Sequence, residues 1–347
     1  MAQICLALDA CASVSSVLRN SVFRTRSEGF PRWLSVVLFA SVLALSAGAS
    51  KRIQVALRYV PGETLRYRIE SRTTTSGKIT TPIVNPEGIT ESTLAVHLLV
   101  RLDVLERPPA SAPGATRFRA TYEKSSVDSQ ADAVDPAQPS PSAPYARLEG
   151  RSLEFTVEPS GDLVSLEGLE DIFPDRTAAQ SALSWFGALA SGSRFPVSGI
   201  EIGQKWKSEH RVDGAPLSDL IWRAESTYLR NESCPSDAGT TNPAPAARDA
   251  CAMILTRFTI SRRGSPRSDA TPDDYLHNGL RVSGAWTGSG ERLDSVSLSA
   301  GLLVRSTQTS DQKVDYQITR VATGSQIHNQ SHVQFQSEAT LIPASPP

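Results

Sequence analysis

Three short motifs contain residue types that act as nucleophiles or phosphate binders in enzymes, but none has the context that its chemistry requires. Ser310-Asp311-Gln312-Lys313 matches Ser-x-x-Lys, which needs a helix to bring the lysine over the serine, and it lies between runs that predict strands. Gly288-Ser289-Gly290 lacks the strand-to-helix elbow of a hydrolase serine. Ser76-Gly77-Lys78 lacks the earlier glycine of a phosphate-binding loop. We expect the first and third motifs to be turns, and we assign no catalytic residue.

Metal-ligating residue types are present but are not grouped. His328 and His332 are four residues apart, a spacing that brings two ligands together on a helix but separates them by about 13 Å on a strand. The surrounding sequence alternates as a strand does, so we expect surface histidines. The paired acids Glu170-Asp171 and Asp273-Asp274 lie in turn-like sequence and are predicted to be solvated. We therefore expect no metal site and no cofactor.

Aromatic residues remain as candidates for a binding site. On a curved sheet their rings would line a cleft for an apolar ligand. The alternative is that they are core residues packed under a helix, with Trp185 the one that could face outward. The five candidates are Trp185, Trp206, Trp222, Tyr228 and Trp286.

The cysteines predict one disulfide. Cys5 and Cys11 lie in the N-terminal segment, whereas Cys234 and Cys251 flank a loop and each adjoins a run that reads as a strand. A bridge between the last two would close the base of a hairpin, and chain-entropy models give such a loop about 3 kcal/mol. Two free thiols are the alternative, and a metal site is disfavoured because no histidine lies near.

The long apolar run at 33–50 predicts export. Its hydrophobic core, 34–46, is preceded by arginines and followed by Ala47-Gly48-Ala49, a small-x-small pattern that fits signal peptidase. We expect residues 1–49 to be an N-terminal extension plus a cleaved signal peptide, which would make the protein periplasmic or extracellular. The alternative is an inner-membrane protein held by this single uncleaved segment.

The rest of the chain alternates with a period of two. In 94–105 the apolar residues point one way while His97, Arg101 and Asp103 point the other, as expected for a strand with one face in a core. About a dozen such runs predict antiparallel strands, because strands of parallel sheets are apolar throughout. They include 53–59, 65–69, 118–122, 153–157, 254–260, 280–286, 314–318 and 333–341.

A single helix is predicted over 175–191, where Ala179, Leu183 and Phe186 contribute to an apolar stripe. We therefore predict a mainly β fold: a large antiparallel curved sheet or open barrel with one covering α-helix. Residues 50–343 form one such domain. Its loop or disordered inserts are expected at 126–145, 235–250 and 262–276.

Two segments carry a resemblance. VPGETLRYRIES, starting at Val60, and VSGAWTGSGERLDSVSLSAGLL, starting at Val282, resemble exported β-rich bacterial proteins of unassigned function. The resemblance implies a β-rich architecture and brings no catalytic residues with it. By fold-level analogy, many strands and one covering helix are also similar to the open half-barrels of lipoprotein carriers.

The expected function is that of a non-catalytic exported envelope protein that binds a hydrophobic or lipid-like ligand on a curved sheet. Two alternatives stay open: an interaction or assembly module that uses a sheet edge, and a hydrolase-type enzyme without a recognisable motif. Such an enzyme would bring together residues such as His97, His210 and Asp294. The expected partner is a lipid or another envelope protein, with membrane contact only through an uncleaved N-terminal segment. A net charge of −1 gives no nucleic-acid footprint.

Overall fold

The computed structural model describes most of the chain after residue 51. The predicted leader, the predicted helix 175–191 and Trp185 lie outside the described residues. None of the helices in the described part is both long and apolar enough to cross a bilayer. The described ranges are 52–55, 58–80, 90–105, 114–131, 145–158, 163–168, 172, 195–196, 198–212, 216–235, 249–262 and 264–342.

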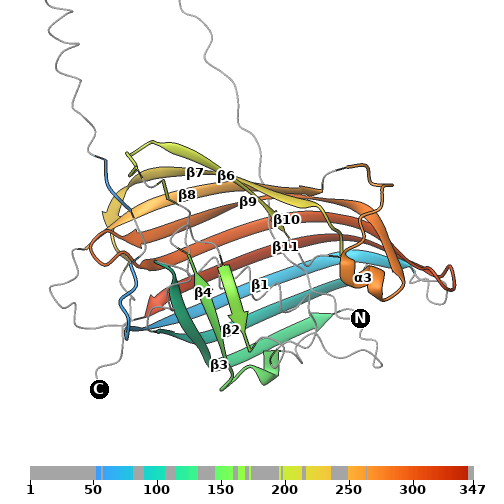
Figure 1. Cartoon of the computed structure of the whole chain (residues 1–347), viewed down its shortest axis with the longest axis horizontal. Coiled ribbons are helices and arrows are strands. Elements are labelled where there is room, and N and C mark those ends of the chain that lie inside the picture. The colour runs from blue at the N-terminus through green and yellow to red at the C-terminus, as the bar shows by residue number, and fades with distance from the viewer. Residues whose placement is uncertain are drawn as a thin grey trace, which may run out of the picture.

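Eleven strands form one sheet in the order β5-β4-β3-β2-β1-β11-β10-β9-β8-β7-β6, and every neighbouring pair is antiparallel (Figure 1). Only the β1–β11 pair joins the two ends of the chain. The prediction of a mainly β, antiparallel curved sheet is confirmed. The strands are β1 (Thr64–Thr80), β2 (Thr90–Val104), β3 (Thr116–Ala131), β4 (Ser152–Val157), β5 (Leu163–Glu167), β6 (Lys205–Val212), β7 (Leu220–Ser233), β8 (Ala250–Arg262), β9 (Leu280–Ser297), β10 (Leu303–Arg320) and β11 (Gln326–Ile342).

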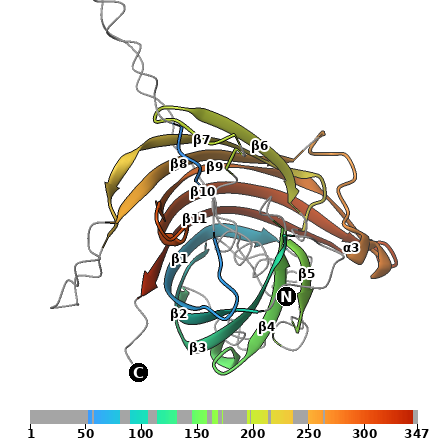
Figure 2. The same ribbon diagram turned by 60° about the vertical axis from the view of Figure 1, so that its left-hand side comes forward.

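The sheet is strongly curved and does not close. In Figure 2, β1 to β5 curl under the broad arc formed by β6 to β11. One sheet face is the inner face of this curve, because Tyr67 and Phe118 from the curl share an apolar cluster with Tyr228 and Ile254 from the arc. We call this the concave face and the opposite one the convex face. The alternation of the strands places most of their buried apolar residues on the concave side, with exceptions such as Ile221 and Met253.

Two apolar clusters lie at opposite ends of the strands. The first cluster contains Tyr67, whose hydroxyl donates to the Leu303 carbonyl at 2.9 Å; burial raises the pKa of this phenol well above its ordinary value. The second cluster is built around Ile260, Val282 and Trp286, at the other ends of β8 and β9. Each cluster holds the sheet in its curve, since it buries apolar area from several strands at once.

Chain segments outside the long strands complete both ends. At the first cluster Ile53 forms an isolated antiparallel bridge with Ile200, so the described part of the predicted strand 53–59 is a bridge and not a strand. At the second cluster Tyr275 packs from a short helix, α3 (Asp273–His277), within the region predicted as the loop 262–276. Asp273-Asp274, predicted in a turn, begins this helix.

The strands are longer than the sequence patterns predict. The loop expected at 126–145 begins later, because β3 continues to Ala131, paired with Ser92 of β2. The motifs at 76–78 and 310–313, which we expected to be turns, lie inside β1 and β10. These turn predictions are wrong: polar residues occupy both sheet faces there, so the local pattern loses the apolar alternation that marks a strand.

Candidate functional site on the concave face

The four described aromatic candidates lie on the concave face, divided between the two clusters. Trp206 of β6 and Tyr228 of β7 belong to the first cluster, and Trp222 of β7 and Trp286 of β9 to the second. The fifth, Trp185, is outside the described residues. The structure therefore does not bring these aromatic residues into one group.

The Tyr228 side chain is fully buried, and its hydroxyl donates to Asn231 Oδ1. Burial raises the pKa of this phenol, and the hydrogen bond partly opposes that shift. Trp222 lies between His210 and Phe258, with ring-centroid distances of 4.4 and 5.4 Å. Both residues are thus packed among other side chains of the concave face.

Between the two clusters the concave face is polar. One row of directly paired residues crosses six neighbouring strands from β7 to β1 without an apolar member. At one end of the row Ser226 and Thr256 share a buried hydrogen bond at 2.8 Å. We call this row and the two adjacent residues Ser310 and Gln312 the polar band. The row consists of Ser226, Thr256, Arg292, Gln308, Ser337 and Ser71.

A buried ion pair borders the polar band. Arg292 Nε lies 3.0 Å from Asp294 Oδ2, and the two side chains are only 10% and 1% exposed. Asp294 also accepts a hydrogen bond from Ser306 Oγ at 2.7 Å. Removing two charges from water costs more than a surface pair does, so a buried pair is unexpected in a purely structural sheet.

Buried polar atoms without a partner occur on the same face. Ser310 Oγ, Gln312 Nε2, Trp222 Nε1 and Asn329 Oδ1 have no hydrogen-bond partner among the described residues. Their strand positions all lie on the concave side. Buried polar groups are normally satisfied, so the unsatisfied atoms of the neighbouring Ser310 and Gln312 indicate a place where water or a ligand binds.

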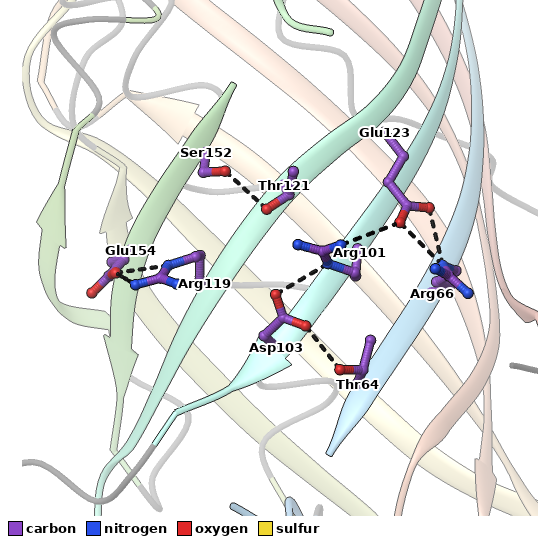
Figure 3. Close-up of polar contacts among 9 residues, drawn as sticks. All are labelled: Thr64, Arg66, Arg101, Asp103, Arg119, Thr121, Glu123, Ser152 and Glu154. Carbon is purple, nitrogen blue, oxygen red and sulfur yellow. Dashed lines mark hydrogen bonds and ion pairs between the residues drawn. The ribbon is translucent and has the colours of Figure 1, made fainter. Parts of the chain in front are cut away.

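The convex face differs from the concave face in that it carries ion pairs between partly exposed side chains. Glu123 sits at a bulge in β3 and accepts from Arg66 at 3.0 Å, and Arg119 contacts Glu154 at 2.7 Å (Figure 3). Arg101 joins the network through Asp103 at 3.1 Å. These paired charges cancel, so this part of the convex face offers no field of one sign to a charged partner.

The residues that an enzyme of this sequence would use do not converge. His97 lies on the convex face of β2, whereas His210 and Asp294 lie on the concave face of β6 and β9. β6 and β9 are three strands apart, about 14 Å. His328 and His332 are on strand β11, and each pairs with its own aspartate, at 2.7 and 2.6 Å. Within the described ranges no three metal-binding side chains come together.

A small surface pocket of about 230 Å³ lies beside the start of β9. Its Arg281 is already paired with Asp269 at 2.9 Å, and both side chains are 56% exposed. The hydrogen bonds from Thr271, opposed by desolvation and supported by Arg281, lower the pKa of Asp269. Because the Arg281–Asp269 pair is exposed to solvent, this pocket is a weaker candidate than the concave face.

Sequence reasoning missed most of the polar band. Gln312 was visible only as part of Ser-x-x-Lys, and Arg292 was not singled out. Both alternate with neighbours in a way that is equally typical of solvent-facing residues. A signal did exist in Gly288 and Gly290, two side-chain-free positions on one face of a strand.

Comparisons with known proteins show distant likenesses in structure alone. No protein-family model matches the chain, and no curated protein matches it. Among solved structures, one that addresses lipid-protein interactions in lipovitellin has a TM-score of 0.41 and 10% identity over 84% of this chain. The match covers 26% of the lipovitellin chain, so the present chain spans about a quarter of that protein's length.

Two bacterial structures match more weakly. A DUF1329 family protein from Desulfovibrio piger ATCC 29098 has a TM-score of 0.12 and 10% identity, over 76% of this chain and 83% of that one. The outer membrane protein OprG from Pseudomonas aeruginosa has a TM-score of 0.16 and 7% identity, over 83% of this chain and 100% of that one. All three likenesses are distant, and the function proposed below is based on the chain's own residues.

Proposed function

We propose that the protein is a non-catalytic exported envelope protein that binds a hydrophobic or lipid-like ligand on the concave face of its sheet. One observation carries the proposal: between two apolar clusters, the concave face holds buried polar atoms that the described residues leave unpaired. An amphiphilic ligand would cover apolar side chains and supply the missing hydrogen bonds. On the convex face, the charged side chains drawn in Figure 3 pair with one another.

The proposed export is supported by chemistry that is separate from the ligand site. Cys234 and Cys251 form a disulfide that closes the loop between β7 and β8. Disulfides persist in oxidising compartments and are rare in the cytosol. Together with the predicted signal peptide, the bond favours a periplasmic or extracellular protein.

Native mass spectrometry of the full chain, purified under gentle conditions from the cell envelope, tests the ligand proposal. We expect a bound mass of a few hundred daltons that organic extraction releases. Gly290→Leu would project a side chain from the concave face of β9 and should abolish the bound mass. Ser289→Leu, the neighbouring position on the convex face, should retain it.

Circular dichroism and thermal unfolding would show that both variants keep the sheet. A wild-type chain that carries no extra mass and takes up no acyl lipid from mixed micelles would contradict the proposed function. Equal loss of the bound mass in both variants would contradict the placement on the concave face.

A further inference from the structure

Gln312 is held in one orientation by a neighbouring tryptophan. Its side chain lies on the concave face of β10 and is fully buried, and Trp286 Nε1 donates to its Oε1 at 2.5 Å. An indole N–H is only a donor, so the atom that it contacts must be the amide oxygen. The amide nitrogen of Gln312 therefore points away from Trp286. Its two N–H groups find no acceptor in the described part of the chain.

Ser310 places a second unsatisfied group beside the first. It lies two residues earlier on the same face of β10, is 6% exposed, and its Oγ has no partner within the described residues. Directly across on β9 the paired positions are Gly290 and Gly288, which carry no side chain. The two unsatisfied groups thus border a stretch of backbone that carries no side chain of its own.

Apolar side chains flank these glycines on the far side. The next strand, β8, pairs Phe258 with Gly290 and Ile260 with Gly288, and both side chains are buried. On β9 itself, Trp286 lies two residues before Gly288. A ligand atom above Gly288 and Gly290 would therefore have hydrogen-bond donors on one side and hydrocarbon on the other.

The charge of the surroundings selects the kind of acceptor. The nearest buried charges are Arg292 and Asp294, which pair with each other at 3.0 Å and cancel. The groups at Gln312 and Ser310 are neutral, and a buried carboxylate or phosphate without a counter-charge would cost far more than two neutral hydrogen bonds return. The site suits an uncharged carbonyl oxygen.

Building on the proposed function, we propose that Gln312 and Ser310 bind the carbonyl oxygen of an uncharged acyl ester or amide whose hydrocarbon chain lies over the apolar residues of the concave face. Gln312 donates through Nε2 and Ser310 through Oγ. Trp286 is a positioning residue, because it holds the amide in the orientation that presents its N–H groups.

Competition binding on the full chain tests this assignment. Three probes of matched chain length, methyl oleate, 1-octadecene and sodium oleate, would each displace the uncharged fluorophore N-phenyl-1-naphthylamine. In the wild type we expect the ester to bind about tenfold more tightly than the hydrocarbon, as one or two buried hydrogen bonds provide. The carboxylate should bind more weakly than the ester.

Substitutions then locate the effect. Gln312→Leu should reduce ester affinity to that of the hydrocarbon and leave hydrocarbon affinity unchanged. Because this change also leaves Trp286 Nε1 unpaired, the double variant Trp286→Phe/Gln312→Leu removes both partners and guards against misfolding. Gln336→Leu, an exposed glutamine on the convex face of β11, is the control and should bind all probes as the wild type does.

The outcomes separate the two proposals. If ester and hydrocarbon bind with equal affinity, or if both Gln312 variants keep the preference for the ester, the carbonyl assignment is overturned while ligand binding on the concave face stands. Tighter binding of oleate than of the ester would also overturn it, in favour of an anion site. If none of the three probes displaces the fluorophore, the proposed function itself fails.

Discussion

Arg292 and Asp294 of β9 form the most buried ion pair found among the described residues. Another residue of β9, Glu291, takes part in an exposed ion pair that serves for comparison. Arg257 of β8 contacts Glu291 of β9 at 2.6 Å on the convex face, with side chains 68% and 42% exposed. The two pairs involve the same strand but differ in solvation. They therefore separate the effect of burial from that of strand position.

We predict that Asp294→Asn lowers the free energy of unfolding by about 3–5 kcal/mol, because the buried Arg292 would lose the carboxylate with which it is paired. Arg257→Ala should lower it by about 1 kcal/mol or less, since an exposed pair contributes little. Urea unfolding at neutral pH, with the slope checked for constancy, measures both values. Losses of equal size would contradict the buried character of the Arg292–Asp294 pair.

The hairpin of β7 and β8 shows how one covalent bond acts on an element. Cys234 and Cys251 are 17 residues apart in sequence, and their Cα atoms lie 4.9 Å apart. Next to the bridge, the backbone N–H of Cys234 donates to the Asp249 carbonyl at 2.9 Å. The disulfide thus closes the long connection where the two strands separate, as the sequence predicts.

We predict that Cys234→Ser/Cys251→Ser lowers the free energy of unfolding by about 3 kcal/mol, because the unfolded chain regains the entropy of the closed loop. Urea unfolding of the oxidised wild type and of the double variant gives this difference. Wild type treated with a reductant should match the double variant. A double variant as stable as the oxidised wild type would contradict a stabilising role for the disulfide.

At the scale of the whole molecule, the open sheet leaves two edges, β5 and β6. Unpaired backbone groups at an edge invite pairing with another chain. Lys205 of β6 pairs with Glu225 of β7 at 2.8 Å, and Lys207 of β6 is exposed on the same convex face. The hydrogen bond from Lys205, with its charge, lowers the pKa of Glu225. Charged residues at alternate edge positions are a usual protection against such pairing.

We predict that the full chain does not associate through β6. Sedimentation velocity over a hundredfold range of protein concentration should give one unchanged species. Lys205→Val/Lys207→Val should shift the protein toward dimers, whereas Arg257→Val on the central strand β8 should not. If the wild type instead forms a dimer, and Glu209→Pro in β6 abolishes that dimer, the result would favour the alternative of an assembly module.

Local sequence patterns were enough to predict the class of the fold, the hairpin disulfide and the alternation of side chains along a strand. Alternation such as that of 94–105 is a local pattern, because successive side chains of a strand point to opposite faces. In the structure most of this run lies in β2, where Val100 and Leu102 are buried. The lengths of the strands were harder to predict from the sequence. Around Ser310 and Gln312 the residues on both faces of β10 are polar, so the sequence there does not alternate between apolar and polar residues.

Which polar residues are buried and which lie in water depends on how the strands come together in the fold. Arg292 and Arg257 look alike in the sequence, yet the curve of the sheet puts one on the concave side and the other on the convex side. Burial depends on residues far apart along the chain, such as Tyr67 and Tyr228 meeting in one cluster. The polar band is set by the register of six strands, and register is a property of pairs of strands that no single stretch of sequence contains.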